Sequence, residues 1–482
     1  MRLRVIVFNC DPERGLDEQP HGAPGKGPRR MKKRRRKNLI TSQVSPSNWP
    51  IVGSFADKAK DLDAFRIAVV EAASVSMGLW FSFLFVLFYL AIAVGSVTHR
   101  DLLFANPVKL PFLNVELPLV GFFIIAPVLF LVIHAFVLLH LVILAGKLSE
   151  FDTELRARTA DPVVQERLRR QLPSVIFVQL LAGPDSVRTG VLGLMLRLVA
   201  QISLIVGPIT LLVLFELQFL PFHRAEITWW HRIAVLLDLA ILWLLWPSIA
   251  DGKVTWIGWR DFLHWRIAGA AAASILTFLF VVTLALFPGE WLEDKLPATW
   301  KSLHEIVISG EADVDPITRR PTSLWPNSNR IVLPGLDIID HAKLDSDEKL
   351  AAVSETLSLR TRRLEGAVLY NANLKKVDLT GARLKGANFK DARLQGALLN
   401  KAELNEAIFI GANLEGAFLQ SALLNGARLN GASLQGANLF EADLSGAEFE
   451  EARLFCSGAF QGKASSCQIQ VCKTGSSKPR WR

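Results

Sequence analysis

The sequence LEGAVLYNANLKKVDLTGARLKGANFKDARL at residues 364–394 sets a pattern that continues without a break to residue 454. Leu or Phe returns at every fifth position, and Ala stands two residues before each centre after the first, with Val377 as the exception. A period of five matches neither the α-helix nor the β-strand, whose side chains repeat every 3.6 and 2 residues. It matches a chain that turns a corner every five residues. We therefore predict a solenoid, in which each turn buries its apolar side against the next.

The aromatic centres indicate how many repeats make one turn. Phe389, Phe409 and Phe449 are separated by 20 and 40 residues. If four repeats form one square coil, the three rings fall in a single stacked column, so we predict 20 residues per coil. The predicted core of the solenoid consists of centre residues such as Leu364, Leu384, Phe389, Leu404, Phe409, Leu424 and Phe449.

The repeat resembles the pentapeptide-repeat family, whose consensus is Ala, then Asn or Asp, then Leu, then two variable residues. Residues 372–376 (Ala-Asn-Leu-Lys-Lys) and 412–416 (Ala-Asn-Leu-Glu-Gly) are close to this consensus. The likeness covers residues 361–455, and it implies an all-β, right-handed quadrilateral β-helix, the pentapeptide-repeat solenoid. Nearly five coils at strand spacing would stand about 23 Å tall.

A second pattern lies upstream, where the apolar residues gather between residues 76 and 288. Five runs are long enough to cross about 30 Å of hydrocarbon as helices. They lie at about 77–97, 118–145, 198–220, 233–250 and 267–287. A short amphipathic helix is expected at 54–74, and the apolar stretch 172–181 is expected at the membrane interface because it is too short to cross. The predicted fold is thus a helical transmembrane bundle plus a β-helix.

These patterns divide the chain into five parts. We predict a disordered basic tail at 1–50, a membrane domain at 51–288 and a linker with an N-terminal cap at 289–360. The β-helix follows at 361–455 and a C-terminal cap or tail at 456–482. A short helix from Asp345 to about Leu357 is expected to cover the open first coil.

Lys and Arg predict the orientation in the membrane. The basic run 29–37 precedes the first span, and seven cations lie between residues 147 and 188, so both segments are expected in the cytoplasm. With five spans the β-helix lies outside the cytoplasm, and the family resemblance suggests the periplasmic side of a bacterial inner membrane. If the short fourth run is re-entrant, four spans remain and the β-helix is cytoplasmic.

Ionisable side chains within membrane spans are costly and are therefore candidate functional residues. They are His134 and His140 in the second run, Glu216 in the third and Asp238 in the fourth. His134 and Asp238 are expected to pair between helices. Structural pairing is the main interpretation, and a proton relay or ion gate is the alternative.

The surface of the β-helix offers a second candidate site. Leu398 and Phe418 each precede a centre and are 20 residues apart, so they should stack on one face. Ile408 and Ile410 flank another column, and we predict a partner patch around these four residues. Residues 362–401 carry nine basic and three acidic side chains, and residues 402–453 carry two basic and eight acidic ones. The column is therefore basic at its base and acidic at its tip.

The motifs predict no enzyme, no cofactor and no metal site, because we find no phosphate loop, nucleophile elbow or metal-spaced Cys and His cluster. Cys456, Cys467 and Cys472 follow the last coil, and outside the cytoplasm two of them could form a disulfide. Some pentapeptide-repeat proteins imitate DNA and bind gyrase. That role needs a strongly acidic column, so nucleic-acid mimicry and nucleic-acid binding are not expected here.

The sequence thus predicts a multi-pass membrane protein that displays a rigid β-helix as a protein-interaction or scaffold surface. The expected partners are the lipid bilayer and another protein. The bipolar column and the small residues at 268–273 also permit self-association. The alternative is a channel or transporter in which the β-helix is a regulatory domain.

Overall fold

The computed structural model describes residues 52–112, 115–251, 265–288, 290, 295, 328–342, 344 and 347–453. The predicted tail at 1–50, Leu454 and the three Cys residues that follow it lie outside the described residues. All contacts described below belong to the compact unit that begins at Asp57. The helices and strands are α1 (Val52–Gly95), α2 (His99–Phe104), β1 (Val108–Leu110), β2 (Val115–Leu117), α3 (Leu119–Arg158), α4 (Pro162–Arg169), α5 (Ile176–Ala182), α6 (Asp185–Arg188), α7 (Gly190–Gln201), η1 (Ile202–Val206), α8 (Gly207–Phe219), η2 (Leu220–Phe222), α9 (Ala225–Asp251), α10 (Trp265–Leu284), α12 (Ile338–His341) and α13 (Asp347–Ala352).

Among the described residues, four helical segments are long and apolar enough to cross a membrane. They are Leu62–Gly95, Leu119–Arg158, Gly190–Phe222 and Ala225–Ala250. The fourth is a continuous helix although Pro247 lies within it, so the structure gives no support to a re-entrant segment there. The fifth predicted run corresponds to α10, whose apolar part Ala268–Thr283 is shorter than these four.

Two predicted boundaries were wrong. The separate amphipathic helix at 54–74 does not exist, because α1 runs without interruption through it and into the first apolar run. No Pro interrupts this stretch, and Gly78 alone does not stop a helix that is supported on both sides. The third run is also longer than predicted, since α7, η1, α8 and η2 follow one another directly. The apolar stretch at 172–181 contains α5, which packs against α3 and α7.

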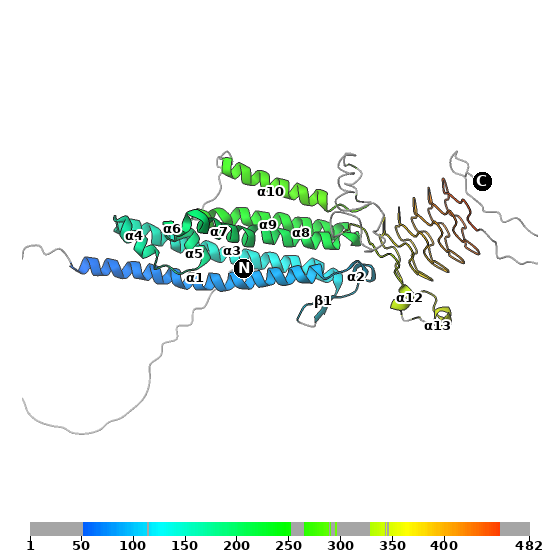
Figure 1. The fold of residues 1–482 in the computed structure, drawn as a ribbon, viewed down its shortest axis with the longest axis horizontal. Coiled ribbons are helices and arrows are strands. Elements are labelled where there is room, and N and C mark those ends of the chain that lie inside the picture. The colour runs from blue at the N-terminus through cyan, green and yellow to red at the C-terminus, as the bar shows by residue number, and fades with distance from the viewer. Residues whose placement is uncertain are drawn as a thin grey trace, which may run out of the picture. The chain divides into compact units, whose positions relative to one another are not determined.

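Side-chain contacts fix the direction in which neighbouring helices run. Arg232 of α9 reaches the carbonyl of Ala285, and Trp243 of α9 reaches Ser274, so α9 and α10 are antiparallel. Helix α3 is parallel to α9, because Phe123 contacts His231 and His134 contacts Asp238 farther along both helices. It is antiparallel to α1, because Ser76 contacts His140 while Phe83 contacts His134. Helices α1, α8 and α10 therefore end at the end of the bundle where α3 and α9 begin (Figure 1). A small antiparallel hairpin, β1–β2, lies in the connection between α2 and α3.

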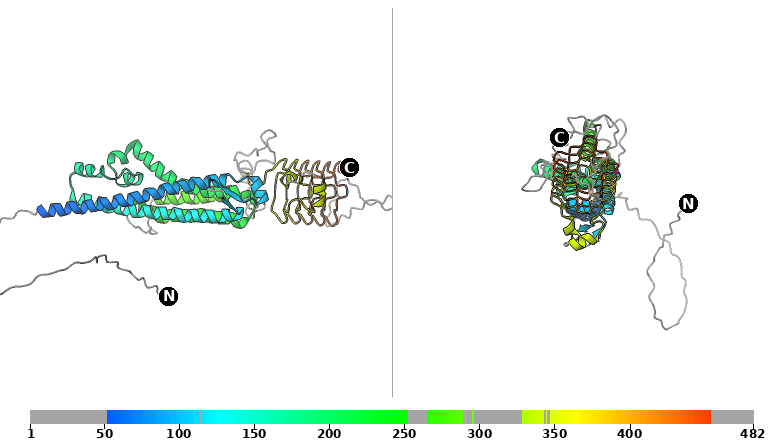
Figure 2. Two further views of the ribbon diagram at one scale, coloured as in Figure 1. Left: turned by 90° about the horizontal axis from the view of Figure 1, so that it is seen from below. Right: turned by 90° about the vertical axis from the view of Figure 1, so that its right-hand side faces the viewer.

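The repeat region is a right-handed quadrilateral β-helix, and its coil length is the predicted 20 residues. Arg363, Arg383, Glu403, Leu423 and Asp443 form one ladder of parallel bridges, and three equivalent ladders make up the other faces. Along each face the backbone N–H groups donate to carbonyls one coil away, as from Leu364 to Arg383 at 2.8 Å. The left view of Figure 2 shows the stacked coils.

The predicted core residues are buried except at the end of the column. Leu364, Leu384, Leu404 and Leu424 are fully buried, and so are Phe389 and Phe409. The rings of Phe389 and Phe409 stack with centroids 5.1 Å apart and planes only 6° from parallel. Phe449 lies in the last described coil and is half-buried.

The corner residues explain why glycine follows many of the centres. The second residue after each centre has a positive φ, as at Gly381 (66°), a conformation that suits glycine best. Lys376 and Asp391 adopt the same conformation (55° each), so glycine is favoured at this corner but not required.

The β-helix begins earlier than the repeats do. Val332 and Asp337 already form parallel bridges with Val368 and Asn373, so the predicted linker contributes strands to an irregular first coil. The expected cap helix is shorter than predicted, since α13 spans only Asp347–Ala352. Lys376 holds it at the side of the column, because its Nζ donates to the carbonyls of Leu350 at 2.8 Å and Val353 at 2.9 Å.

The stacked Phe pair gives a first test of the core. Phe409→Ala should lower the free energy of unfolding by about 3–5 kcal/mol, because it leaves a cavity between rigid coils that cannot collapse. Chemical denaturation of the purified chain measures this loss. Phe418→Ala removes the same ring from a site that is 44% exposed and should change stability far less. Equal losses for the two variants would contradict the stacked core.

Candidate functional site

The first coil of the β-helix is joined to the helix ends by a buried ion pair. His223 follows η2, and its Nδ1 lies 3.1 Å from Oε2 of Glu365 in the first repeat. Its Nε2 donates to the carbonyl of Asn329 at 2.7 Å. Both ring nitrogens of His223 therefore face acceptors. Burial alone would raise the pKa of Glu365, but the hydrogen bond and charge of His223, together with Arg363, lower it.

Two arginines of the same repeat complete the junction. The guanidinium of Arg362 lies 4.0 Å from the ring centroid of Phe222 and donates to the carbonyl of Leu102 at 3.0 Å. Burial, and then repulsion by Arg224, lower the pKa of Arg362 to about 10, so it remains a cation at neutral pH. Arg363 lies over the ring of Phe287 at 5.4 Å. Cation–π contacts of this kind, with half-buried arginines, fix an orientation as well as adding stability.

Helix α2 contributes a neutral histidine to this junction. The backbone N–H of Val332, in the irregular first coil, points to Nδ1 of His99 at 3.4 Å. Burial lowers the pKa of His99 to about 4, although its hydrogen bond to the backbone of Arg330 works in the opposite direction. The first coil therefore contacts α2, η2 and the segment after α10, and the helix ends close its base.

A second buried cluster lies just inside the bundle. Arg232 of α9 has no exposed surface, and its guanidinium contacts Glu216 of α8 at 3.0 Å and Glu290 at 2.7 Å. A further N–H donates to the carbonyl of Ala285 at 2.7 Å. The predicted intramembrane acid Glu216 is thus bound to a cation, and within the described part of the chain its second oxygen has no partner. The cluster ties α8, α9 and the end of α10 together.

The structure brings His134 and Asp238 together, as the sequence suggested. Nδ1 of His134 lies 2.6 Å from Oδ1 of Asp238, and both side chains are fully buried. Nε2 of the same ring must donate to the carbonyl of Leu204, 3.1 Å away. That carbonyl is available because Pro208, four residues later, has no N–H, and the backbone widens there into the π-helical turn η1.

The same arrangement occurs a second time. Pro127 lies inside α3 and cannot donate to the carbonyl of Phe123. His231 of α9 donates to this carbonyl instead, with Nε2 at 2.8 Å. In hydrocarbon an unpaired carbonyl costs several kcal/mol, so each histidine compensates for a proline on a neighbouring helix. The hydrogen bond from His134 to the carbonyl of Leu204 is a structural role that the sequence analysis did not foresee.

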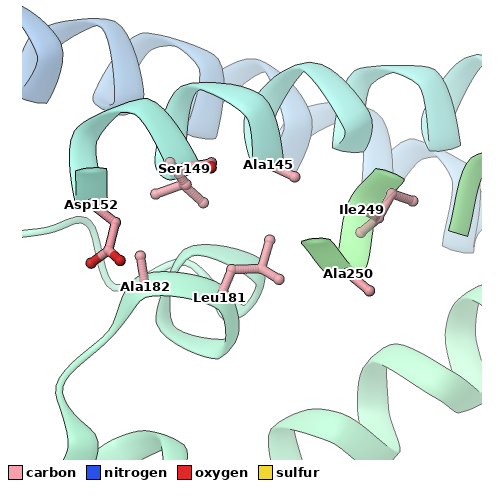
Figure 3. Close-up of a pocket in the computed structure, with 8 residues that line it drawn as sticks. Ala145, Ser149, Asp152, Leu181, Ala182, Ile249 and Ala250 are labelled. Atoms are coloured by element: carbon pink, nitrogen blue, oxygen red, sulfur yellow. The ribbon is translucent and has the colours of Figure 1, made fainter. Parts of the chain in front are cut away.

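His140 lies apart from these clusters. It is half-buried, and its Nδ1 approaches the carbonyl of Phe136 in its own helix at 3.0 Å. A cavity of about 140 Å³ lies at the opposite end of the bundle from the junction. Figure 3 shows it between α3, α5 and α9, with Ser149 and Asp152 at its edge. Asp152 is already paired with Arg156 and Arg169, so the cavity offers no free carboxylate.

The apolar surface of the β-helix differs in part from the predicted patch. Leu398 and Phe418 are neighbours in one ladder, as expected. Ile408 lies in a different ladder between Asn388 and Arg428, and Ile410 follows it at the next corner, so neither extends this patch. The sequence analysis missed Leu423 and Phe440, which are 40% and 54% exposed. Leu423 lies on the adjoining face, and the carbonyl of Phe440 accepts from Ser421 at the corner between the two faces.

The Arg232 cluster gives a stability test. Arg232→Met should cost about 3–5 kcal/mol, because it leaves two acids buried without a cation. Adding Glu216→Gln and Glu290→Gln should recover most of the loss. The midpoint of unfolding in detergent measures both effects. Arg224→Met is the matched control, since its ion pair with Glu226 is exposed and should contribute less than about 1 kcal/mol. A triple variant that is no more stable than Arg232→Met would contradict this account.

His99 gives a pH test. Its pKa is about 4 in the folded chain and 6.5 when unperturbed, so between these values the unfolded chain binds the proton more tightly. The contribution of His99 is complete above pH 6.5 and is lost as the pH falls toward 4, by at most about 3 kcal/mol. The midpoint temperature of unfolding should be measured between about pH 4.5 and 7.5, the range in which His99 takes up its proton on unfolding. It should depend less on pH in His99→Gln than in the wild type. Identical pH profiles would refute the assignment.

Comparisons with known proteins identify the column. The family model for pentapeptide repeats matches eight copies, at residues 363–386, 387–426 and 419–454. A pentapeptide repeat protein from the thylakoid lumen of Arabidopsis thaliana is 30% identical over 20% of this chain and 68% of its own, with a TM-score of 0.20. Rfr23 from the cyanobacterium Cyanothece 51142 is 28% identical over 23% of this chain and 99% of its own, with a TM-score of 0.10. A comparison with curated proteins gives no match. Through residues 363–454, the chain belongs to the pentapeptide-repeat family.

Proposed function

We propose that this chain is a multi-pass membrane protein that holds its β-helix as a rigid protein-binding column at the membrane surface. The observation that carries the proposal is the junction at the first coil. A buried ion pair between His223 and Glu365 and the contact of Arg362 with Phe222 join the base of the column to the helix ends. A partner bound to the column would therefore be held at a fixed distance from the bilayer.

The directions of the helices support five crossings. Helix α10 is antiparallel to α9 and ends beside Arg232, where the junction lies. It would return the chain from the far end of the bundle, so the β-helix and the beginning of α1 would lie on opposite sides of the membrane. The basic segment 147–188 belongs to the far end, and its positive charge favours a cytoplasmic position for that end. The column would then project into the periplasm of a bacterial cell, as the repeat family led us to expect.

The apolar patch on the column is the proposed binding surface. Phe418, Leu423 and Phe440 form its exposed part, and the half-buried Leu398 lies beside Phe418 in the same ladder. Glu403 and Asp443 lie above and below Leu423 in its ladder. A partner with an apolar anchor and basic side chains at its edge would fit this surface. A second copy of the chain, with the basic base of its column, is one such partner.

A channel or transporter remains the alternative function, and it would have to use the intramembrane pair His134–Asp238. The described surroundings of this pair are aromatic, since the ring centroid of His134 lies 5.1 Å from that of Phe83 and 6.1 Å from that of Phe130. The hydrogen bond to Leu204 explains the position of the histidine without any conduction role. The column is therefore the better-supported functional element.

The patch is tested by paired substitutions. The double variant Leu398→Ala with Phe418→Ala should reduce at least one co-purifying protein about tenfold or more, since losing two apolar anchors removes more than about 1.4 kcal/mol of binding. Quantitative mass spectrometry of the detergent-extracted chain measures this loss. Ile408→Ala with Ile410→Ala is the matched control on another face. A full set of partners retained by the patch variant would refute the proposed surface.

A further inference from the structure

The hairpin β1–β2 presents an aromatic side chain that the rest of the protein leaves uncovered. Phe112 follows β1 at the turn and is 90% exposed, the largest exposure among the large apolar side chains of the described residues. Its φ of 65° lies in the left-handed region, which bulky residues rarely occupy. A backbone conformation of this kind points to a functional constraint at the turn.

The hairpin has two chemically distinct faces. The pairs Val108–Leu117 and Leu110–Val115 share one face, because directly opposed residues in an antiparallel ladder point to the same side. Val108 is buried at the root, and Val115 is 45% exposed near the tip. The other face carries Lys109 and Glu116, whose charged groups lie 3.7 Å apart. The hairpin is therefore amphipathic, with an apolar tip and an ion pair on its outer side.

The position of the hairpin in the chain places it at the membrane surface. It lies between the candidate spans Leu62–Gly95 and Leu119–Arg158, and β2 ends two residues before α3 begins. From Leu119 back to Phe112 the extended chain reaches no more than about 25 Å. The exposed Trp230, whose Nε1 donates to the carbonyl of Ile124 in the second turn of α3, is suited to the interfacial aromatic belt at this end. Figure 1 shows β1 at the flank of the helices rather than between them and the coils.

We propose that the hairpin tip inserts into the interfacial layer of the bilayer on the side of the β-helix, with Phe112 as its lipid-facing anchor. The inference rests on the proposed function, since it needs the helices to cross the membrane. Lipid is the occupant that fits these observations. The uncharged tip is tethered beside the bilayer, while Lys109 and Glu116 lie on the opposite face, toward water and head groups.

The anchor would act close to the junction. Helix α2 precedes the hairpin, and its residues His99 and Leu102 contact the first coil through Val332 and Arg362. A tip fixed in lipid would therefore hold α2, and with it the base of the column, at a constant depth. This would add a third support to the two buried clusters at the helix ends.

The test measures the depth of residue 112 in a bilayer. In a full chain with its four native Cys residues replaced by Ser, Phe112→Cys carries the fluorophore NBD, and the protein is reconstituted into nanodiscs of phosphatidylcholine and phosphatidylglycerol. Leu129→Cys, at an exposed position ten residues after the start of α3, is the embedded control. Glu450→Cys, on the exposed surface of the last described coil, is the aqueous control.

Insertion predicts that NBD at position 112 emits at shorter wavelength than at 450 and is quenched by lipids with a shallow nitroxide. Iodide in the buffer should quench it several-fold less than at 450. If position 112 behaves like 450 while 129 is embedded, the anchor is refuted and the membrane architecture stands. If 129 is also aqueous, the proposed function fails and the anchor fails with it. Shielding of position 112 from both quenchers would show that protein covers the tip and would overturn the lipid assignment.

Discussion

The structure depends on one constraint, which is that every backbone carbonyl and N–H buried away from water needs a partner. In a membrane helix an internal proline breaks this rule, because the carbonyl four residues earlier loses its donor. Pro127 and Pro208 create two such carbonyls, and His231 and His134 supply the missing donors from neighbouring helices. Both histidines use Nε2 for this bond, so the carbonyl each one serves fixes a proton on that nitrogen. The bundle is thus joined by polar contacts that exist because of its prolines.

The β-helix meets the same constraint by stacking, and this gives it an unprotected beginning. Each coil donates to and accepts from its neighbours, so the first coil needs a partner below it. The segment around Val332 and Asp337 supplies backbone pairing for two faces, and the helix ends supply side chains such as Phe222 and Phe287. The helical domain therefore acts as the cap of the solenoid, which is the role that the sequence assigned to a short helix near Asp345.

The sequence was sufficient to predict those parts of the structure that follow from a short repeating pattern. The five-residue repeat was enough to predict the coil of 20 residues, the buried centres and the stacked Phe389 and Phe409. It was not enough for contacts between residues far apart in the chain, such as Arg232 with Glu290 or His223 with Glu365. Neither pair follows a periodic pattern, and both acids lie outside the predicted spans. One signal was available: the carbonyls four residues before Pro127 and Pro208 lose their helical donors, and nearby histidines can supply new ones.

The segment after α10 connects the two buried clusters. The carbonyl of Ala285 and the carboxylate of Glu290 bind Arg232 inside the bundle. Between them, the carbonyl of Leu286 accepts from Asn329, and the ring of Phe287 stacks on His223 at 5.3 Å. A displacement of the column would therefore have to break buried polar contacts on both sides of this segment at once. Because such contacts have few alternative arrangements, this segment couples the base of the column to α9 and the end of α10.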